Sequence, residues 1–170
     1  MQTTFADAIQ AVRDELSVEI AVCPEQVHEA LRLRHGVSCE ERIGLEQDEF
    51  DPSSCHVLVR SRQTGVAVAA VRVVMSDTGL DGLPIRRVCA ASVLRPLPAM
   101  STGEISRFVL VRDRSGVSAA AGALVRLALI RGIVQISAEQ KLTHWCAVME
   151  RPLLRSSPRR FRRGSPAEWS

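Results

Sequence analysis

Residues 56–75 read HVLVRSRQTGVAVAAVRVVM, two apolar, β-branched runs around a short connection that contains Gly65. Runs of this composition form strands, and a glycine in a short connection is typical of a hairpin turn. The second run is almost entirely apolar, so we expect its strand in the interior of a sheet, with a neighbour on each side. The stretch therefore predicts an antiparallel hairpin at the centre of a sheet.

A third strand is predicted downstream, in the run EISRFVLVR at residues 104–112. Alternation along a strand places successive side chains on opposite faces. The two expected faces are Ile105, Arg107 and Val109 on one side and Ser106, Phe108 and Leu110 on the other.

Helices are predicted before the hairpin and after the third strand. Residues 6–16 predict a short helix, and residues 24–41 a second helix with an approximate apolar face, ended by Gly44. Residues 118–136 are small and branched apolar residues with few polar breaks, which predicts a long helix with most of its surface buried. HWCAVM, at residues 144–149, is a candidate buried strand. This order predicts an α+β fold, with helices packed on a mainly antiparallel sheet.

Length and composition favour one globular domain. The chain has 170 residues, of which 46% are hydrophobic and 24% charged, and we expect a domain at 1–154 and an Arg/Ser/Pro-rich, disordered tail at 155–170. No apolar run approaches the roughly 20 residues that cross a bilayer. The N-terminal residues contain acids and lack the apolar core of a signal peptide, so we expect a cytoplasmic location.

Cysteines and charge exclude some classes of function. The five cysteines are scattered, with no C-x-x-C pair, which favours reduced thiols over disulfides or a metal site. The tail RSSPRRFRRGSPAEWS holds five arginines against one acid, a composition that suits nucleic acid or an acidic partner as well as a solvated chain end. Nucleic acid is the weaker alternative, because aromatic residues make up 4% of the chain and tyrosine is absent.

Three segments together resemble a known group of enzymes. They are LRLRHGVSCEERIGLEQDEFD at residues 31–51, the strand end VRVV, and GEISRF at residues 103–108. In this order and at these separations they resemble the autoinducer (N-acylhomoserine lactone) synthases and the related exosortase-associated acyltransferases and N-acyl amino acid synthases. The resemblance covers roughly residues 28–150. His56 in CHVLV and the LPI segment at 83–85 resemble the exosortase-associated branch more than the autoinducer branch.

The resemblance implies a GNAT-like fold that transfers a fatty acyl group from acyl carrier protein or coenzyme A to an amine. It implies no permanently bound cofactor and no metal. The candidate catalytic residues are Glu104 and Arg107. Residues of the implied substrate site are Arg34, Asp48, Asp51, Arg72 and Phe108. In place of a glycine-rich phosphate loop the chain has RDRSGVS, where Arg112, Arg114 and Gly116 are candidates to meet a phosphopantetheine phosphate or an acidic carrier protein.

Acyl transfer to an amine makes specific chemical demands. The attacking amine must lose a proton, so a nearby carboxylate such as Glu104 is useful as a base, although Glu104 paired with Arg107 would equally be a structural acid. The thioester oxygen needs fixed donors, expected from backbone N–H groups between residues 108–111 and HWCAVM. Arg34 and Arg72 are expected to pair with Asp48 and Asp51, either to position the acceptor or only to hold the fold.

The sequence also departs from the family pattern. After residue 154 it changes to the Arg/Ser/Pro-rich composition, where the family continues with further strands, so we expect the C-terminal strands to be missing and a sheet edge to be exposed. Ser38 and Cys39 stand where autoinducer synthases carry an aromatic residue that packs on the substrate. The alternatives to an N-acyltransferase are therefore an inactive truncated paralogue, an autoinducer synthase and a basic-tailed nucleic-acid-binding module, and a homo-oligomer is left open.

Overall fold

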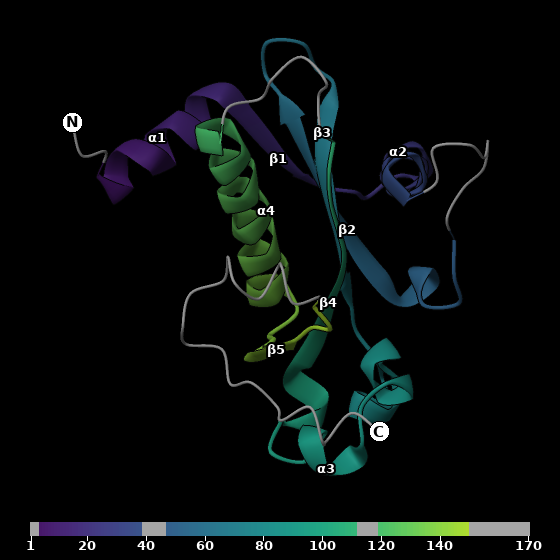
Figure 1. The fold of residues 1–170 in the computed structure, drawn as a ribbon. Coiled ribbons are helices and arrows are strands. Elements are labelled where there is room, and N and C mark those ends of the chain that lie inside the picture. The colour runs from purple at the N-terminus through teal and green to yellow at the C-terminus, as the bar shows by residue number, and fades with distance from the viewer. Residues whose placement is uncertain (1–3, 39–46, 112–118, 150–170) are drawn as a thin grey trace.

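A computed structural model describes residues 4–38, 47–111 and 119–149. Five strands form one sheet in the order β1-β2-β3-β4-β5 (Figure 1). Neighbours from β1 to β4 are antiparallel, and β5 runs parallel to β4. The predicted α+β fold with a mainly antiparallel sheet is confirmed. The strands are β1 (Leu16–Ile20), β2 (Ser54–Ser61), β3 (Ala67–Val74), β4 (Thr102–Leu110) and β5 (His144–Cys146).

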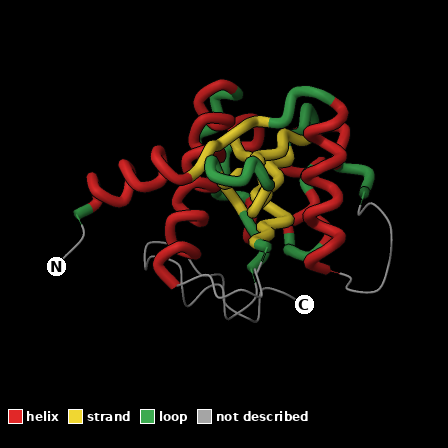
Figure 2. Tube along the Cα trace, turned by 90° about the horizontal axis from the view of Figure 1, so that it is seen from above, coloured by secondary structure: helices red, strands yellow, loops and turns green. Residues whose placement is uncertain are grey.

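Helices cover both faces of the sheet, as the view from above shows (Figure 2). On one face lie α1 (Phe5–Glu15) and α4 (Ala119–Glu139), and on the other α2 (Pro24–Ser38) (Figure 1). The connection from β3 to β4 contains only short helical turns at one end of the sheet, in agreement with the predicted loop. These are η2 (Gly79–Gly82), η3 (Pro84–Arg87), α3 (Ala91–Leu94) and η4 (Ala99–Ser101), while η1 (Asp51–Ser53) precedes β2.

The predicted hairpin is formed by β2 and β3. Val57 pairs with Val71 and Leu58 with Ala70, and Gly65 in the turn has φ of +69°, a conformation that glycine adopts without strain. All but one of the residues of β3 are buried, because β2 and β4 flank this strand and helices cover its two faces. The expectation of a central strand is thus confirmed.

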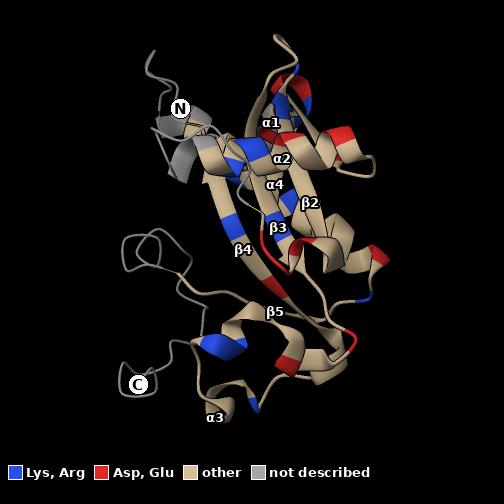
Figure 3. Cartoon of the chain, turned by 90° about the vertical axis from the view of Figure 1, so that its right-hand side faces the viewer, with Lys and Arg blue, Asp and Glu red and all other residues tan. Residues whose placement is uncertain are grey.

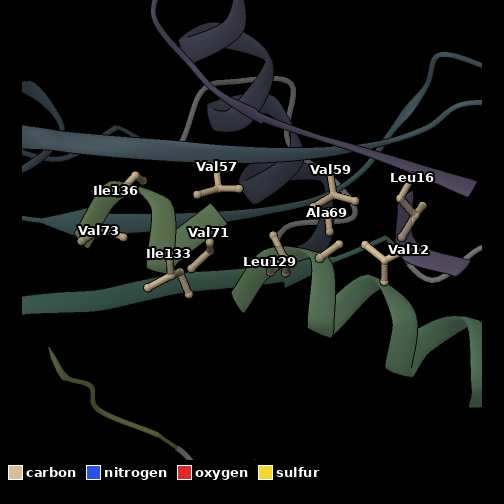
Figure 4. Close-up of a cluster of buried hydrophobic side chains, with 11 residues drawn as sticks. Val12, Leu16, Val57, Val59, Ala69, Val71, Val73, Leu129, Ile133 and Ile136 are labelled. Carbon is tan, nitrogen blue, oxygen red and sulfur yellow. The ribbon is translucent and has the colours of Figure 1, made fainter. Parts of the chain in front are cut away.

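The main core lies between α4 and the sheet (Figure 4). Valines of β2 and β3 project toward buried apolar residues of α4, and Val12 of α1 and Leu16 close one end. Gly132 brings α4 very close to the sheet, since a Cβ atom there would lie 2.3 Å from Cγ1 of Val57 and 3.1 Å from Cγ1 of Val18. Both neighbours are β-branched and stiff about χ1, so they have little freedom to move away.

Replacing Gly132 by alanine is therefore expected to destabilise the protein by about 1–3 kcal/mol, the usual cost of overpacking a core. The gain in helix propensity, about 1 kcal/mol, offsets part of this cost. Gly122→Ala is the matched control on the same helix, because the nearest atom to its Cβ would be Nη1 of Arg126 at 3.7 Å, at the end of a flexible side chain. In urea denaturation the control should be as stable as the wild type or more so. Equal stability of the two variants would contradict the close approach of α4.

Two features of the sheet differ from the prediction. The strand β1 was not predicted, and it begins directly where α1 ends. In β4 the simple alternation is broken, because Arg107 has φ of +54° and one extra residue of β4 lies opposite β3. Beyond this bulge the faces exchange, so Ile105 packs with Phe108 and Leu110 against the main core.

The exposure of two other elements was also wrongly predicted. Ile130 of α4 is 45% and Val134 50% exposed, because the helix covers the sheet with one side only. HWCAVM forms a strand only at β5, which is the last strand of the sheet among the described residues, and Trp145 is 38% exposed instead of buried. The end of α2 predicted near residue 41 and the tail at 155–170 fall outside the described residues.

Candidate active site

A network of alternating charges lies on the α2 face of the sheet. Arg34 Nη1 donates to Asp51 Oδ1 at 2.6 Å, and Arg72 Nη1 donates to the same oxygen at 2.8 Å and to Asp48 Oδ1 at 2.5 Å. Arg107 Nη2 lies 3.3 Å from Asp48 Oδ2. Basic and acidic segments of β3, β4 and the adjoining loop accordingly lie close together in Figure 3. Side chains from α2, the loop before β2, β3 and β4 thus meet at one place.

Hydrogen bonds within the acidic loop fix its backbone conformation, independently of the arginines. Asp51 Oδ2 accepts the backbone N–H of Asp48 at 2.8 Å, and Asp48 Oδ1 accepts that of Phe50 at 3.0 Å. Such side-chain bonds to nearby backbone N–H groups are what make aspartate a turn residue. The loop is therefore shaped to present both carboxylates to the sheet.

The network is a buried structure with one accessible end. The side chains of Arg34, Arg72 and Asp51 are 1–3% exposed, against 25% for Asp48 and 41% for Arg107. Burial alone would raise the pKa of Asp48, but the bonds from Arg72 and from the Phe50 N–H outweigh it and lower the pKa to about 2. The same balance lowers the pKa of Asp51. Both aspartates are carboxylates at neutral pH.

His56 of β2 lies under this network, directly opposite Arg72 in the register. Its Nε2 is buried, has no hydrogen-bond partner and lies 3.7 Å from Asp51 Oδ1. Arg34 Nε and Nη2 are likewise buried without a hydrogen-bond partner, although Nη2 lies 3.9 Å from Asp48 Oδ2. Burial lowers the pKa of His56 to about 4, although Asp51 acts in the opposite direction. The imidazole is neutral in the folded protein over most of the pH range.

A pH dependence of stability follows from His56. Between pH 6.5 and about 4 the unfolded chain binds a proton on this residue that the folded chain does not, so stability rises with pH across this window and falls on acidification. Its contribution to the loss is up to about 3 kcal/mol, because one pKa unit corresponds to about 1.4 kcal/mol. His56→Gln should reduce the slope of unfolding free energy against pH in this window, as measured by urea denaturation. An unchanged slope in the variant would contradict the neutral, buried imidazole.

Glu104 lies on β4, on the same face as Arg72 and near it. Its side chain is buried, and Oε2 accepts the backbone N–H of Ile85 at 2.5 Å. Burial raises the pKa of Glu104, although the Ile85 bond and the charge of Arg72 lower it. A carboxyl group with a raised pKa is a stronger base when ionised, which suits proton abstraction near neutral pH.

The strands β4 and β5 pair only near one end. Their register runs from Thr102 opposite His144 to Glu104 opposite Cys146, whereas β4 continues to Leu110. Arg107 lies in this continuation, in a left-handed conformation that is costly for a residue with a side chain. Strain of this kind occurs where a site requires a particular backbone geometry. Within the described residues the pairing of β4 with β5 therefore ends at Glu104 and Cys146, earlier along β4 than the parting predicted near residues 108–111.

The structure brings together most of the residues predicted from the sequence. Arg34, Asp48, Asp51, Arg72 and Arg107 form the network, and Glu104 is beside it. Phe108 is elsewhere, because the bulge turns it to the main core on the opposite face. The predicted donor residues Arg112, Arg114 and Gly116 lie outside the described residues.

Three groups of the site were not predicted. Ser106 Oγ accepts a bond from Arg72 Nε at 3.1 Å, Ile85 supplies its N–H to Glu104, and Cys146 is the partner of Glu104 on β5. Each lies in a segment that the sequence singles out, Ser106 in GEISRF, Ile85 in LPI and Cys146 in HWCAVM. Their roles beside Arg72 and Glu104 depend on contacts between segments far apart in the chain.

Within 4–38, 47–111 and 119–149, no group of three or more His, Cys, Asp or Glu side chains has the arrangement of a metal site. None of the helices in those ranges is long and apolar enough to cross a membrane.

The mixed sheet with its parting of β4 from β5, and helices on both faces, is that of an acyltransferase of the GNAT class. The family model described as an acetyltransferase (GNAT) domain matches residues 29–122, and the chain belongs to this family. No curated protein matches the sequence significantly.

Solved structures share the fold at low sequence identity. LasI, an AHL synthase, has a TM-score of 0.59 at 17% identity over 82% of this chain and 75% of LasI. FeeM, an N-acyl amino acid synthase from uncultured soil microbes, has a TM-score of 0.59 at 15% identity, over 83% and 75% of the two chains. BjaI, a CoA-dependent acyl-homoserine lactone synthase solved with SAM and isopentyl-CoA, has a TM-score of 0.58 at 22% identity, over 84% and 69%.

Proposed function

We propose that the protein is an N-acyltransferase that moves a fatty acyl group from acyl carrier protein or acyl-CoA to the amine of an amino acid-like acceptor, in the cytoplasm. The observation that carries the proposal is Glu104, a buried carboxyl group with a raised pKa. It lies between the arginine–aspartate network and the end of the β4–β5 pairing. A base is thereby available between a polar acceptor region and an open strand edge.

The accessible end of the network suits an acceptor that carries both an amine and a carboxylate. The network joins three arginines to two aspartates and so has one excess positive charge, counting only these five groups. Arg107, 41% exposed, is the cation best placed to meet an acceptor carboxylate, and Asp48, 25% exposed, to meet its ammonium group. Arginine binds carboxylates with good geometry, which favours this assignment. Arg34 and Arg72 are engaged by the two aspartates and would hold Asp48 and Asp51 in place.

The region beyond Glu104 and Cys146 suits the thioester of the donor. Backbone N–H groups of a strand that has lost its neighbour are free to stabilise the oxyanion that develops on the thioester carbonyl. The bulge at Arg107 alters the direction of the backbone at this point. The acyl group would then lie within reach of an amine held at Asp48, with Glu104 as the base.

The proposal is tested by release of free thiol and by mass spectrometry of the product. Acyl-CoA donors from acetyl to hexadecanoyl, and the same chains on acyl carrier protein, are offered with a panel of L-amino acids. We expect turnover with a medium or long chain and an N-acyl amino acid as product. A folded protein that releases no thiol from any of these donors would refute the proposal and favour the inactive paralogue.

An autoinducer synthase is the second candidate, supported by the shared fold of LasI and BjaI. BjaI was solved with SAM, so SAM belongs in the acceptor panel. Turnover with SAM and not with amino acids would favour this candidate. The exosortase-associated branch, indicated in the sequence by His56 and the LPI segment, predicts the opposite preference.

A further inference from the structure

Arg87 joins two segments of the proposed site. It is the last residue of the turn η3, and its Nη1 lies 2.5 Å from Glu49 Oε1 in the acidic loop. The guanidinium carbon of Arg87 also lies 4.7 Å from the centroid of the Phe50 ring, the arrangement of a cation–π contact. One side chain of η3 therefore contacts both of the residues that stand between Asp48 and Asp51 in the loop.

Phe50 connects this contact to the carboxylate that is proposed to bind the acceptor. Its ring packs against the apolar cluster that includes Leu83 and Ile85, and Arg87 lies over the same ring. The backbone N–H of Phe50 donates to Asp48 Oδ1 at 3.0 Å. A displacement of Phe50 would therefore also displace Asp48, the residue assigned to the ammonium group of the acceptor.

The same turn holds the proposed base. The N–H of Ile85, two residues before Arg87, donates to Glu104 Oε2 at 2.5 Å. Ile85 is 4% exposed, and its carbonyl oxygen accepts the N–H groups of Val88 and Cys89, so the backbone of the turn is well fixed. The turn η3 thus contacts the base through one residue and the acidic loop through another. The separation between the base and the acceptor carboxylate depends on how firmly η3 and the loop are held together.

The contacts of Arg87 are too exposed to contribute much to stability. Its side chain is 63% and that of Glu49 60% exposed, and ion pairs between exposed side chains have a small net effect on folding. Geometry is more sensitive, because a misplacement of about 1 Å between reacting groups can lower a rate by about 10²-fold. We therefore expect the removal of Arg87 to affect the reaction more than the fold.

We propose that Arg87 is a positioning residue, which holds the acidic loop on η3 and so keeps Asp48 and Glu104 at the separation that acyl transfer needs; this inference rests on the proposed N-acyltransferase function. An ammonium group bound at Asp48 must lie within reach of the Glu104 carboxylate, which receives its proton. Without Arg87 the loop is free to move relative to η3, and the acceptor is held less firmly against the base. Arg87 acts through Phe50 and the loop, without touching the acceptor.

The test measures kcat and the separate KM values for donor and acceptor, with the acyl-CoA and amino acid that the wild type uses best. Arg87→Ala should lower kcat/KM for the acceptor by about 10- to 10²-fold, with the KM for the donor and the urea midpoint unchanged. Arg87→Lys keeps a positive charge facing Glu49 but not the planar group over Phe50, and should lie between Arg87→Ala and the wild type. Arg86→Ala is the matched control in the same turn, because Arg86 pairs instead with Asp81 of η2, and it should retain wild-type kinetics.

A double-mutant cycle with Phe50→Leu identifies the route of the effect. Leucine retains an apolar contact with the cluster but offers no ring to Arg87. If Arg87 acts through Phe50, the losses in kcat/KM are not additive, and Arg87→Ala should cost little once residue 50 is leucine.

Three results would overturn the inference while leaving the proposed function intact. They are additive losses in the cycle, wild-type kcat/KM in Arg87→Ala, and a loss of activity in Arg87→Ala that is matched by a loss of stability in urea. Absence of turnover by the wild type with every donor and acceptor would instead refute the proposed function, and the role of Arg87 with it.

Discussion

Replacement of Glu104 by glutamine is expected to lower turnover by about 10²- to 10⁴-fold, the range for loss of a general base. The variant should fold at least as stably as the wild type. Burial raises the pKa of Glu104, so the buried carboxylate costs the folded protein stability that a neutral side chain would not cost. Glutamine is neutral, and its carbonyl oxygen is able to accept the Ile85 N–H as Oε2 does. A loss of activity without a loss of stability distinguishes a base from a structural acid.

The pH profile provides a second readout of the same variant. In the wild type, kcat/KM should rise with pH through a pKa above 4.5, because that of Glu104 is raised and the carboxylate is the active form. This rising limb should be absent from Glu104→Gln. Glu139→Gln, on the exposed end of α4, is the matched control and should retain both the rate and the profile. Loss of stability in Glu104→Gln with unchanged kcat would assign Glu104 a purely structural role.

Local patterns in the sequence predict the central strands well and the edges of the sheet poorly. The β2–β3 hairpin is recognisable because its two runs and its turn are contiguous. The strand β1 follows α1 with no turn residue between them, although Leu16, Val18 and Ile20 alternate with polar residues and offer a period-two signal. At β5 the apolar run HWCAVM suggested burial, but whether a strand is at an edge depends on its neighbours in the sheet.

Local sequence patterns likewise predict the candidate site only in part. The charged residues were predicted together because they lie in motifs that resemble a family, and the structure brings Arg34, Asp48, Asp51, Arg72 and Arg107 into contact. Alternation alone misassigned the faces of β4, because a single extra residue in a bulge exchanges them. The contacts of Glu104 with Ile85 and Cys146 join β4 to segments far before and far after it in the chain. No local pattern encodes such contacts.

Arg34 is expected to contribute strongly to the stability of the protein. Its side chain is 1% exposed and holds Asp51, itself 3% exposed, at 2.6 Å. Removing one member of a buried ion pair costs about 3–5 kcal/mol, because the remaining charge stays buried. Arg34→Met should fall at the low end of this range, because Asp51 keeps its bonds from Arg72 and from the Asp48 N–H. Urea denaturation followed by circular dichroism measures the change.

Arg32→Met is the matched control, an exposed arginine two positions away on the same helix, and should change stability by no more than about 0.5 kcal/mol. The two variants separate the burial of Arg34 from the general effect of losing an arginine on α2. Buried ion pairs are sometimes replaced by apolar residues without loss, and two nitrogens of Arg34 are buried with no hydrogen-bond partner, which removal would relieve. If Arg34→Met is as stable as Arg32→Met, then the free energy gained by removing the two unsatisfied nitrogens equals the free energy lost by leaving Asp51 with Arg72 alone. The network would then serve to position Asp48 for the acceptor and not to hold α2 on the sheet, and the variant should show a raised KM for the acceptor with the fold intact.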